Sequence, residues 1–322
     1  MGKRFLKTHH LLGRKTHKMV DITHKIVTRR IATAQAIVKV GRVETMEAVK
    51  NKTVPKGNVL EVSRTAGLFA VKNTSNSIPD CHPMPIEFTG IQFDCKEMEI
   101  VIEVTVKTIY RTGVEVEAMH GASIVALTIY DMLKPIDKNV EISTVKLIEK
   151  KGGKSDFGLK KVPALTIAVI VCSDSVSQGL KEDRAGKIVV EKLSTLGLET
   201  AHYVIIPDEV STIQKTVLSL CEEEYDLIIL TGGTGLSPRD VTPEALLPLI
   251  DRRIDGMEET IRAYGQSRTP YAMLSRSVVG FRANTLLMAL PGSTNGAAES
   301  MDAVFPATLH LFKIIKGFNH GA

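Results

Sequence analysis

Cysteines and long apolar runs are both scarce in this chain of 322 residues. The four cysteines lie far apart and form no C-x-x-C pair, which argues against a structural zinc site and against a disulfide framework. A reducing compartment is the default for such a chain, so we expect a cytoplasmic protein. No apolar run approaches the roughly eighteen residues that a membrane helix needs, so we expect no membrane partner.

Acidic residues are absent from the first eighteen positions, which carry six lysines and arginines. The formal net charge of the whole chain is +5, so the remainder carries −1 and offers no basic surface to a nucleic acid. We therefore expect a basic, disordered tail over residues 1–18 and no nucleic-acid partner. The tail lacks the apolar core of a secretion signal, and it lacks the serines of an organelle transit peptide.

Two common phosphate-binding signatures are also missing. G-x-G-x-x-G does not follow the first strand of the C-terminal half, and G-x-x-x-x-G-K-[ST] occurs nowhere. A phosphate site in this chain therefore has to use other glycine-rich loops. Because it lacks the lysine of a P-loop, a metal ion is expected to carry the compensating charge.

The C-terminal half alternates short apolar runs with amphipathic segments. Buried strands are predicted at 165–172, 199–206, 226–231 and 285–290, and helices at 183–196 and 210–223. This alternation predicts an α/β domain of three layers over residues 164–322, in which helices cover both faces of a mostly parallel sheet.

Polar loops follow four of these strands, at the positions where open α/β sheets bind ligands. They contain Asp174, Asp208, the G-G-T-G turn at 232–235 with Asp240 beyond it, and Pro291-Gly-Ser293. Glycine-rich turns let backbone N–H groups form a cradle for anions, so we expect a nucleotide or phosphate site. Asp208 and Asp240 are the natural Mg²⁺ ligands, although a helix N-cap explains either carboxylate equally well.

Six motifs of this half occur in order and resemble the molybdopterin-binding family, and within it the molybdopterin adenylyltransferases of the Mog/MoaB type. They are S-D-x-V-S-x-G at 173–179, D-R-x-G at 183–186, P-D at 207–208, T-G-G-T-G at 231–235, R-D-V-T-P at 239–243 and L-P-G at 290–292. The resemblance implies transfer of AMP from Mg-ATP to the phosphate of molybdopterin, with release of pyrophosphate. A close branch keeps the fold with doubtful activity, so a catalytically silent pterin-binding scaffold is the alternative.

The same resemblance implies the roles of individual residues. Asp208 and Asp240 match the two essential carboxylates and would hold Mg²⁺ together with ATP. Substrate contacts are implied for Asp174, Ser175, Gly232, Gly233, Thr234, Gly235, Arg239, Pro291, Gly292 and Ser293. One departure is Ala185, where serine is commoner in the family, and we expect little effect from it.

The N-terminal half, residues 19–151, mixes helices with amphipathic strands. Residues 99–108 alternate between apolar and charged side chains, as a strand with one solvated face does. Further strands are predicted at 34–40, 86–95 and 140–149, and helices at 44–51, 58–73 and 114–133. The pattern predicts an α+β sandwich with an antiparallel sheet, of the ferredoxin-like kind.

Charged side chains near the ends of the long predicted helix have two interpretations each. Asp131 and Lys134 lie three apart and share a face, which is also what an ordinary ion pair near a helix C-terminus shows. Glu115 and Glu117 point to one side if the backbone is extended, or they complement the helix dipole. An acid/base pair shifted by burial and by neighbouring charges suits a ring rearrangement, and nearby cations suit the release of pyrophosphate.

Six stretches of this half resemble cyclic pyranopterin monophosphate synthase, the molybdenum cofactor biosynthesis protein C family. They are M-V-D-I at 19–22, K-G at 56–57, C-H-P at 81–83, T-G-V-E-V-E-A at 112–118, L-T-I-Y-D-M at 127–132 and K-x-G-G-K-S at 150–155. The resemblance implies conversion of a cyclic dihydroguanosine triphosphate to cyclic pyranopterin monophosphate and pyrophosphate, without a cofactor.

By the same resemblance, Asp131 is the acid/base residue, and Lys56 and Lys134 are its catalytic partners. Substrate contacts are implied for Cys81, His82, Glu115, Val116 and Glu117, and phosphate contacts for Lys150 and Lys154. Asp80 departs from the family, which usually has an apolar residue there, and we expect its carboxylate to face solvent.

The glycine, lysine and proline content of residues 152–163 predicts a short linker between two unrelated domains. We therefore predict a bifunctional enzyme of molybdenum cofactor synthesis whose ligands are cyclic dihydroguanosine triphosphate, molybdopterin and ATP. The families imply a homo-oligomer, either a hexamer or a trimer, and shared three-fold symmetry would satisfy both domains. The rival interpretation is a partner-binding regulator that acts through its basic tail.

Overall fold

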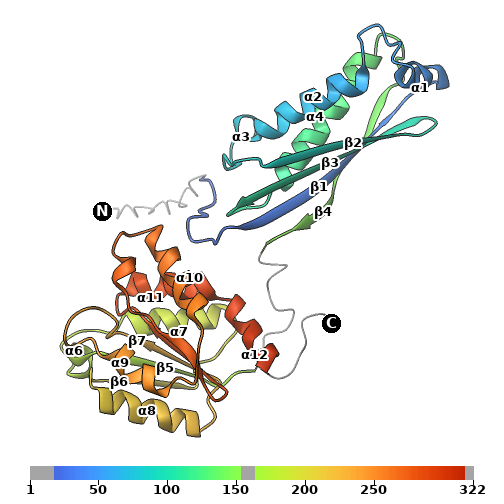
Figure 1. The fold of residues 1–322 in the computed structure, drawn as a ribbon. Coiled ribbons are helices and arrows are strands. Elements are labelled where there is room, and N and C mark those ends of the chain that lie inside the picture. Colours follow the sequence, from blue (N-terminus) through green and yellow to red (C-terminus); the bar gives the residue numbers. More distant parts are fainter. Residues whose placement is uncertain (1–17, 154–163, 316–322) are drawn as a thin grey trace, which may run out of the picture. The chain divides into compact units, whose positions relative to one another are not determined.

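The computed structural model describes residues 18–153 and 164–315 (Figure 1). It divides into two compact units, one made of the residues up to Thr23 with Val27–Lys151 and one made of His24–Ile26 with the residues from Gly152 on. Lys154, most of the expected linker and all but the last residue of the expected basic tail lie outside the described residues. In the described ranges, no helix is both long and apolar enough to cross a membrane.

The N-terminal unit contains the expected antiparallel sheet, with strand order β2-β3-β1-β4. Its elements are β1 (Thr28–Lys39), α1 (Val43–Lys50), α2 (Val59–Lys72), α3 (Thr74–Ser77), β2 (Phe88–Cys95), β3 (Glu99–Tyr110), α4 (Glu115–Leu133) and β4 (Glu141–Lys151). The first strand begins six residues earlier than the apolar pattern predicted, because its pairing with β3 continues through charged residues as far as Thr28. Chain order is therefore strand, helices, two strands, helix, strand.

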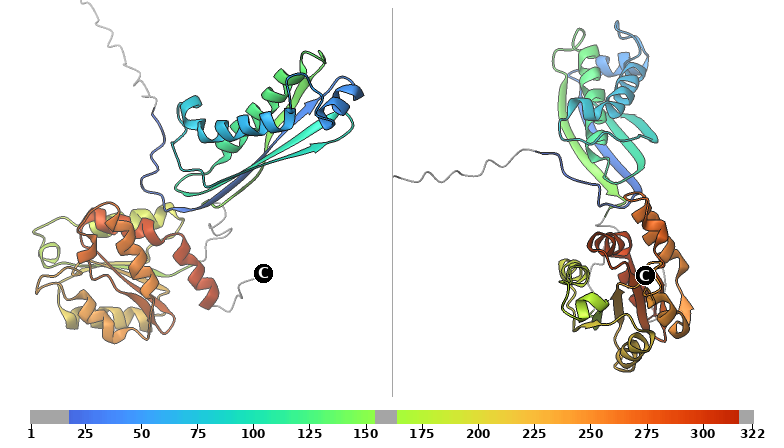
Figure 2. Two further views of the ribbon diagram at one scale, coloured as in Figure 1. Left: turned by 45° about the horizontal axis from the view of Figure 1, so that its top comes forward. Right: turned by 90° about the vertical axis from the view of Figure 1, so that its left-hand side faces the viewer.

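Helices α2 and α4 lie over one face of this sheet (Figures 1 and 2). On β1 the face toward them carries Ala32, Ala34 and Ala36, all fully buried, and small side chains let a helix approach the strand closely. The residues between them on β1 are only half-buried, as the period of two in a strand requires.

The C-terminal unit contains a six-stranded sheet in the order β6-β5-β7-β10-β9-β8. Its strands are β5 (Ile167–Cys172), β6 (His202–Ile206), β7 (Leu227–Thr231), β8 (Arg252–Arg253), β9 (Val279–Arg282) and β10 (Thr285–Leu290). The first four strands of the sheet run parallel, β9 pairs antiparallel with β10, and β8 pairs antiparallel with β9. The predicted mostly parallel sheet is therefore confirmed.

Helices cover both faces of this second sheet and enclose two separate apolar cores. The main helices are α7 (Ala185–Thr195), α8 (Val210–Glu222), α9 (Thr242–Leu246), α10 (Asp255–Gln266) and α11 (Thr294–Val304). α7, α10 and α11 pack on one face, and α8 and α9 pack on the other (Figure 1). Parallel strands covered on both faces must be apolar throughout, and every residue of β5, β7 and β10 is buried.

Candidate functional sites

An ion triad lies at the C-terminal end of α4. Lys56, in the turn before α2, donates to the carboxylate of Asp131 at 2.7 Å and to its main-chain oxygen at 2.8 Å. Lys134 contacts the other carboxylate oxygen at 2.8 Å, through the expected i,i+3 spacing. The structure thus brings together the three residues predicted to be catalytic in the N-terminal domain.

Exposure, rather than burial, characterises this triad. About half of the Asp131 side chain is solvent-exposed, so the expectation that burial shifts its pKa was wrong. Hydrogen bonds from Lys134 and then Lys56 lower the pKa of Asp131 to about 2, because both favour the ionised carboxylate. The same contact raises the pKa of Lys134. Asp131 and Lys134 are consequently charged at neutral pH.

The residues predicted to contact substrate form a second cluster at the other end of α4. The thiol of Cys81 donates to Glu117 at 2.9 Å, and Lys150 on β4 lies 3.5 Å from Glu115. His82 donates through its Nε2 to the main-chain oxygen of Val20 at 2.8 Å, which links the C-H-P stretch to the M-V-D-I stretch. Asp80 is exposed, as expected.

Glu117 is the most unusual side chain of this second cluster. Only 2% of it is exposed, and its Oε2 atom has no hydrogen-bond partner among the described residues. Glu115 and Glu117 both lie in the first turn of α4 rather than in extended backbone, so they point in different directions and only Glu117 is buried. Burial, followed by the bond to Glu117, raises the pKa of the Cys81 thiol to about 12.

The two clusters of the N-terminal unit lie far apart. Glu117 and Asp131 are fourteen positions apart on one helix, a distance of about 21 Å at a rise of about 1.5 Å per residue. A single small substrate cannot contact both ends of α4. The residues that the sequence assigned to one site therefore form two half-sites in a single chain.

In the C-terminal unit, by contrast, the predicted residues converge at one edge of the sheet. Asp174 follows β5, Asp208 follows β6, and the G-G-T-G turn follows β7. The Thr231 hydroxyl donates to Pro291 at 2.9 Å and the Gly232 amide donates to Leu290 at 3.1 Å, so the loop after β10 joins the same group.

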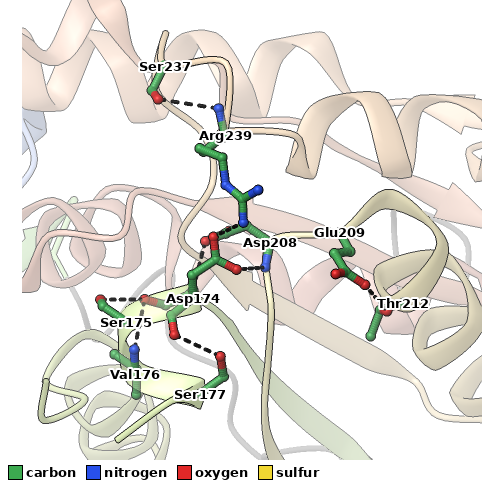
Figure 3. A network of polar contacts seen from close by, with 10 residues as sticks. Asp174, Ser175, Val176, Ser177, Asp208, Glu209, Thr212, Ser237 and Arg239 are labelled. Carbon is green, nitrogen blue, oxygen red and sulfur yellow. Dashed lines mark hydrogen bonds and ion pairs between the residues drawn. The ribbon is translucent and has the colours of Figure 1, made fainter. Parts of the chain in front are cut away.

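Asp174 and Asp208 are joined by two hydrogen bonds, each from the main-chain amide of one to the carboxylate of the other (Figure 3). The amide of Asp174 donates to the carboxylate of Asp208 at 3.0 Å, and the amide of Asp208 donates to the carboxylate of Asp174 at 3.1 Å. The guanidinium of Arg239 pairs with Asp174, which lowers the pKa of that carboxyl group. This reciprocal arrangement fixes the relative position of two neighbouring strand ends.

Asp208 retains a buried oxygen, Oδ1, that has no hydrogen-bond partner in the described part of the chain. Burial raises the pKa of this group, and the negative charges of Asp174 and Asp240 raise it further. A bound cation would relieve both effects, so the carboxylate fits a metal ligand. Within residues 18–153 and 164–315 no three His, Cys, Asp or Glu side chains form a metal site, but Mg²⁺ needs only one or two carboxylates when phosphates and water complete its shell.

The interpretation of these aspartates as helix caps was wrong. The N-cap residue of α8 is Glu209, and the N-cap residue of α9 is Val241. The Asp240 carboxylate instead accepts the amide of Ser237 at 2.8 Å within its own loop. Neither the Asp208 nor the Asp240 carboxylate therefore caps a helix.

Two glycines of the G-G-T-G turn are required by close contacts. Gly232 has a φ of +104°, and a Cβ there would lie 2.1 Å from the main-chain oxygen of Cys172. Gly233 has a φ of +62°, and its Cβ would lie 2.9 Å from the unpartnered oxygen of Asp208. Any larger residue would strain the turn or fill the space beside that oxygen.

Comparison with known proteins agrees with both halves of this description. Residues 19–153 match the MoaC family, and residues 168–310 match a probable molybdopterin binding domain. A molybdenum cofactor biosynthesis bifunctional protein of Chlorobaculum tepidum is 40% identical over 94% of this chain and 96% of its own length. The chain belongs to this family of bifunctional molybdenum cofactor biosynthesis proteins.

Each half also has separate relatives. A cyclic pyranopterin monophosphate synthase of Clostridium perfringens is 50% identical over 42% of this chain and 87% of its own length. The crystal structure of the molybdopterin biosynthesis enzyme MoaB from Thermus thermophilus is 40% identical, covers 48% of this chain and 98% of its own, and has a TM-score of 0.45.

One residue of the molybdopterin binding domain that sequence reasoning missed is Arg276. Its guanidinium donates to the main-chain oxygen of Gly235 at 2.7 Å and to that of Asp240 at 2.6 Å, and it pairs with Glu244. Arg276 therefore holds both ends of the loop that carries Arg239 and Asp240. It lies 32 residues beyond Glu244, and its position in an irregular segment offered no periodic signal.

The D-R-x-G motif of the same domain has a structural role at Asp183. This carboxylate accepts the amides of Gly186 and Lys187 at 2.9 and 3.1 Å, and it accepts the hydroxyl of Tyr203. A Cβ on Gly186 would lie 2.8 Å from that hydroxyl. The motif thus anchors the start of α7 to strand β6.

Proposed function

We propose that each half of this bifunctional family member catalyses one reaction. The N-terminal domain would convert cyclic dihydroguanosine triphosphate to cyclic pyranopterin monophosphate and pyrophosphate, and the C-terminal domain would adenylylate molybdopterin with Mg-ATP. The ion triad of Asp131 supports the first activity. The buried, unpartnered oxygen of Asp208 supports the second.

In the N-terminal domain, the charges of the triad suit a substrate with several phosphates. Lys56 and Lys134 are both bound to Asp131 and charged, so they offer two ammonium groups to a triphosphate. As phosphates draw these cations away, the carboxylate loses the bonds that hold its pKa near 2, and its basicity increases. Substrate binding would thereby turn a weak base into an effective one.

A second copy of the chain would complete this site. The substrate-contact cluster around Glu117 lies at the opposite end of α4 from Asp131, and both ends are needed. If two copies pair with their α4 helices antiparallel, the triad of one copy meets the Glu117 cluster of the other. This arrangement agrees with the homo-oligomer expected from the sequence.

In the C-terminal domain, the loops would hold ATP with its metal. Asp208 and Asp240 would hold Mg²⁺, which when bound neutralises phosphate charge and makes the α-phosphorus more electrophilic. The turn at 232–235 would bind phosphate oxygens. Arg239, whose guanidinium is held by Asp174, would place that positive charge near the transferred phosphate. A silent scaffold has no need of a buried carboxylate oxygen without a partner.

Both activities can be tested on one preparation of the full chain. Purified protein is incubated with cyclic dihydroguanosine triphosphate, or with molybdopterin and Mg-ATP, and pyrophosphate and pterin products are measured. We expect product in both assays. Pterin binding without adenylyl-molybdopterin would contradict the second activity and favour the scaffold.

A further inference from the structure

A buried carboxylate that belongs to neither candidate site lies in the first turn of α10. Glu258 is only 3% exposed, and both of its oxygens have partners. Its Oε1 accepts the main-chain amide of Val279 at 3.0 Å, whereas its Oε2 accepts Arg253 at 2.8 Å and pairs with Arg262 at 3.6 Å. A buried carboxylate is tolerated only when it is paired and hydrogen-bonded, so these contacts define one position for Glu258 and its partners.

The contacts of Glu258 fix one short segment of the chain at two points. Val279 is the first residue of β9, and its amide binds Glu258 directly. Arg262, paired with Glu258, donates to the main-chain oxygen of Ser277 at 3.3 Å. Ser277 and Val279 are both almost fully buried. Helix α10 therefore determines where residues 277–279 lie.

Arg276 immediately precedes this segment and connects it to the loop of Asp240. Its main-chain amide donates to the oxygen of Thr234 at 2.9 Å. Its guanidinium donates to the main-chain oxygens of Gly235 and Asp240, at 2.7 and 2.6 Å. A shift of residues 277–279 would move Arg276 and, with it, the loop that carries Asp240.

We infer that Glu258 is a positioning residue for the proposed adenylyl transfer. It holds the segment that follows Arg276, and Arg276 holds the loop that directs Asp240 toward Mg-ATP. This inference rests on that proposed function. Groups that act in catalysis have to be held within about 0.5 Å of the productive geometry. A small displacement of the loop should therefore weaken the binding of Mg-ATP while the domain remains folded.

The first test compares Glu258→Gln with Asp302→Asn in the full chain. Asp302 on α11 is the matched control, because it forms a half-buried ion pair with Lys192 on α7, at 2.6 Å, on the same face of the sheet. We expect Glu258→Gln to raise the KM for Mg-ATP roughly tenfold, a coupling common within one hydrogen-bond network. Partial unfolding would instead lower kcat and leave KM unchanged. An unchanged KM in Glu258→Gln, or an equal rise in Asp302→Asn, would overturn the inference.

A double-mutant cycle with Arg276→Ala tests whether Glu258 acts through Arg276. Once Arg276 is removed, the connection to the loop is already broken. Adding Glu258→Gln to Arg276→Ala should therefore lower kcat/KM by less than about twofold, compared with roughly tenfold in the wild-type background. A tenfold loss in both backgrounds would mean that the two residues act independently, which would contradict the inference.

A second variant covers the case in which Glu258→Gln does not fold. Without the Glu258 carboxylate, two guanidinium groups lack their shared partner. Combining Glu258→Gln with Arg253→Gln removes one of these positive charges and restores the charge balance. The link from Glu258 to residues 277–279 is still lost, so the same rise in KM is expected. A folded double variant with the wild-type KM would refute the inference.

Hydrogen exchange provides a measurement that does not depend on turnover. The amide of Ser237 donates to the Asp240 carboxylate at 2.8 Å, and the amide of Asp240 donates to Ser237 at 2.9 Å. In the absence of ligands, both amides should exchange faster in Glu258→Gln and at the wild-type rate in Asp302→Asn. Unchanged exchange in Glu258→Gln would refute the positioning role. Faster exchange in a protein that does not adenylylate molybdopterin would refute only the proposed reaction.

Discussion

The two candidate sites are built in opposite ways. In the C-terminal domain, loops from four strands meet within one chain, and Asp174 and Asp208 bind each other directly. In the N-terminal domain, the triad of Asp131 and the buried Glu117 lie at opposite ends of α4. The C-terminal domain brings its candidate residues together within one chain, whereas the N-terminal domain holds them in two separate clusters.

Sheet topology accounts for this difference. Parallel strands all end at the same edge, so every loop that follows a strand is delivered to one place. In an antiparallel sheet the ends alternate between two edges, and functional loops are divided between them. The comparison indicates that the reaction proposed for the N-terminal domain needs two copies of the chain to associate. The contacts of the C-terminal site form within one copy.

The largest effect is expected at the triad. Asp131→Asn should reduce formation of cyclic pyranopterin monophosphate by about 10²- to 10⁴-fold, the usual range for loss of an acid/base group. The variant should retain adenylylation, because that activity is assigned to the other compact unit. Asp94→Asn, the same change at the exposed end of β2, should leave both rates unchanged.

Mixing variants would test whether the N-terminal site is shared between copies. Asp131→Asn and Glu117→Gln chains, co-expressed with different tags and isolated together, should regain activity that neither variant has alone. A mixed pair keeps one intact site of two, so about half of the wild-type rate is expected. If the mixed oligomer stays inactive, each chain builds its own site and the comparison fails.

Asp208→Asn should reduce adenylylation by about 10²- to 10³-fold, because it removes one charge that holds the metal and the transferred phosphate. Asp226→Asn is the matched control, since that carboxylate lies at the opposite edge of the same sheet and accepts the amide of Thr166 at 2.8 Å. Steady-state rates at several Mg²⁺ concentrations provide the measurement. Equal rates for the two variants would exclude Asp208 from the reaction.

Arg276 should show a smaller effect through the position of Asp240. Arg276→Ala loses two charged hydrogen bonds to the loop, and Arg276→Lys can keep only one, so we expect kcat/KM to fall about 100-fold and about tenfold respectively. The KM for Mg-ATP should rise in both variants. If the lysine variant is more active than the alanine variant, Arg276 acts by positioning the loop rather than by general stabilisation of the fold. Unchanged kinetics in a folded alanine variant would contradict the role.

The smallest expected effect is a change in the alkylation rate of the Cys81 thiol. Its raised pKa keeps the thiol protonated at neutral pH, so alkylation of the wild type should be slow. Glu117→Gln removes a negative charge and lowers that pKa, although burial remains, and alkylation of Cys81 should become a few-fold faster. Site-resolved mass spectrometry against pH, with Cys95 as the internal reference, measures this; a fast wild-type reaction would contradict it.

Much of this structure could be read from local patterns. The period of two at 99–108 and the four apolar runs of the C-terminal half predicted β3, β5, β6, β7 and β10 within a few residues, because burial of one or both faces imposes those patterns. The sequence did not predict β8 and β9. The exposure of Asp131 could not be read in the same way. Its helix is apolar and the neighbouring Met132 and Leu133 are buried, but Asp131 lies on the side of the last turn that is exposed to solvent.

Residue types and their spacing in the sequence determined the sheet type of each half and indicated the candidate site residues, because local periodicity and turn chemistry act over short stretches. Tertiary structure alone decided which of those residues meet. It joined Arg276 to the loop of Asp240, paired Asp174 with Asp208, and separated Glu117 from Asp131. Contacts between segments distant in sequence depend on strand order and helix packing, which no local pattern encodes.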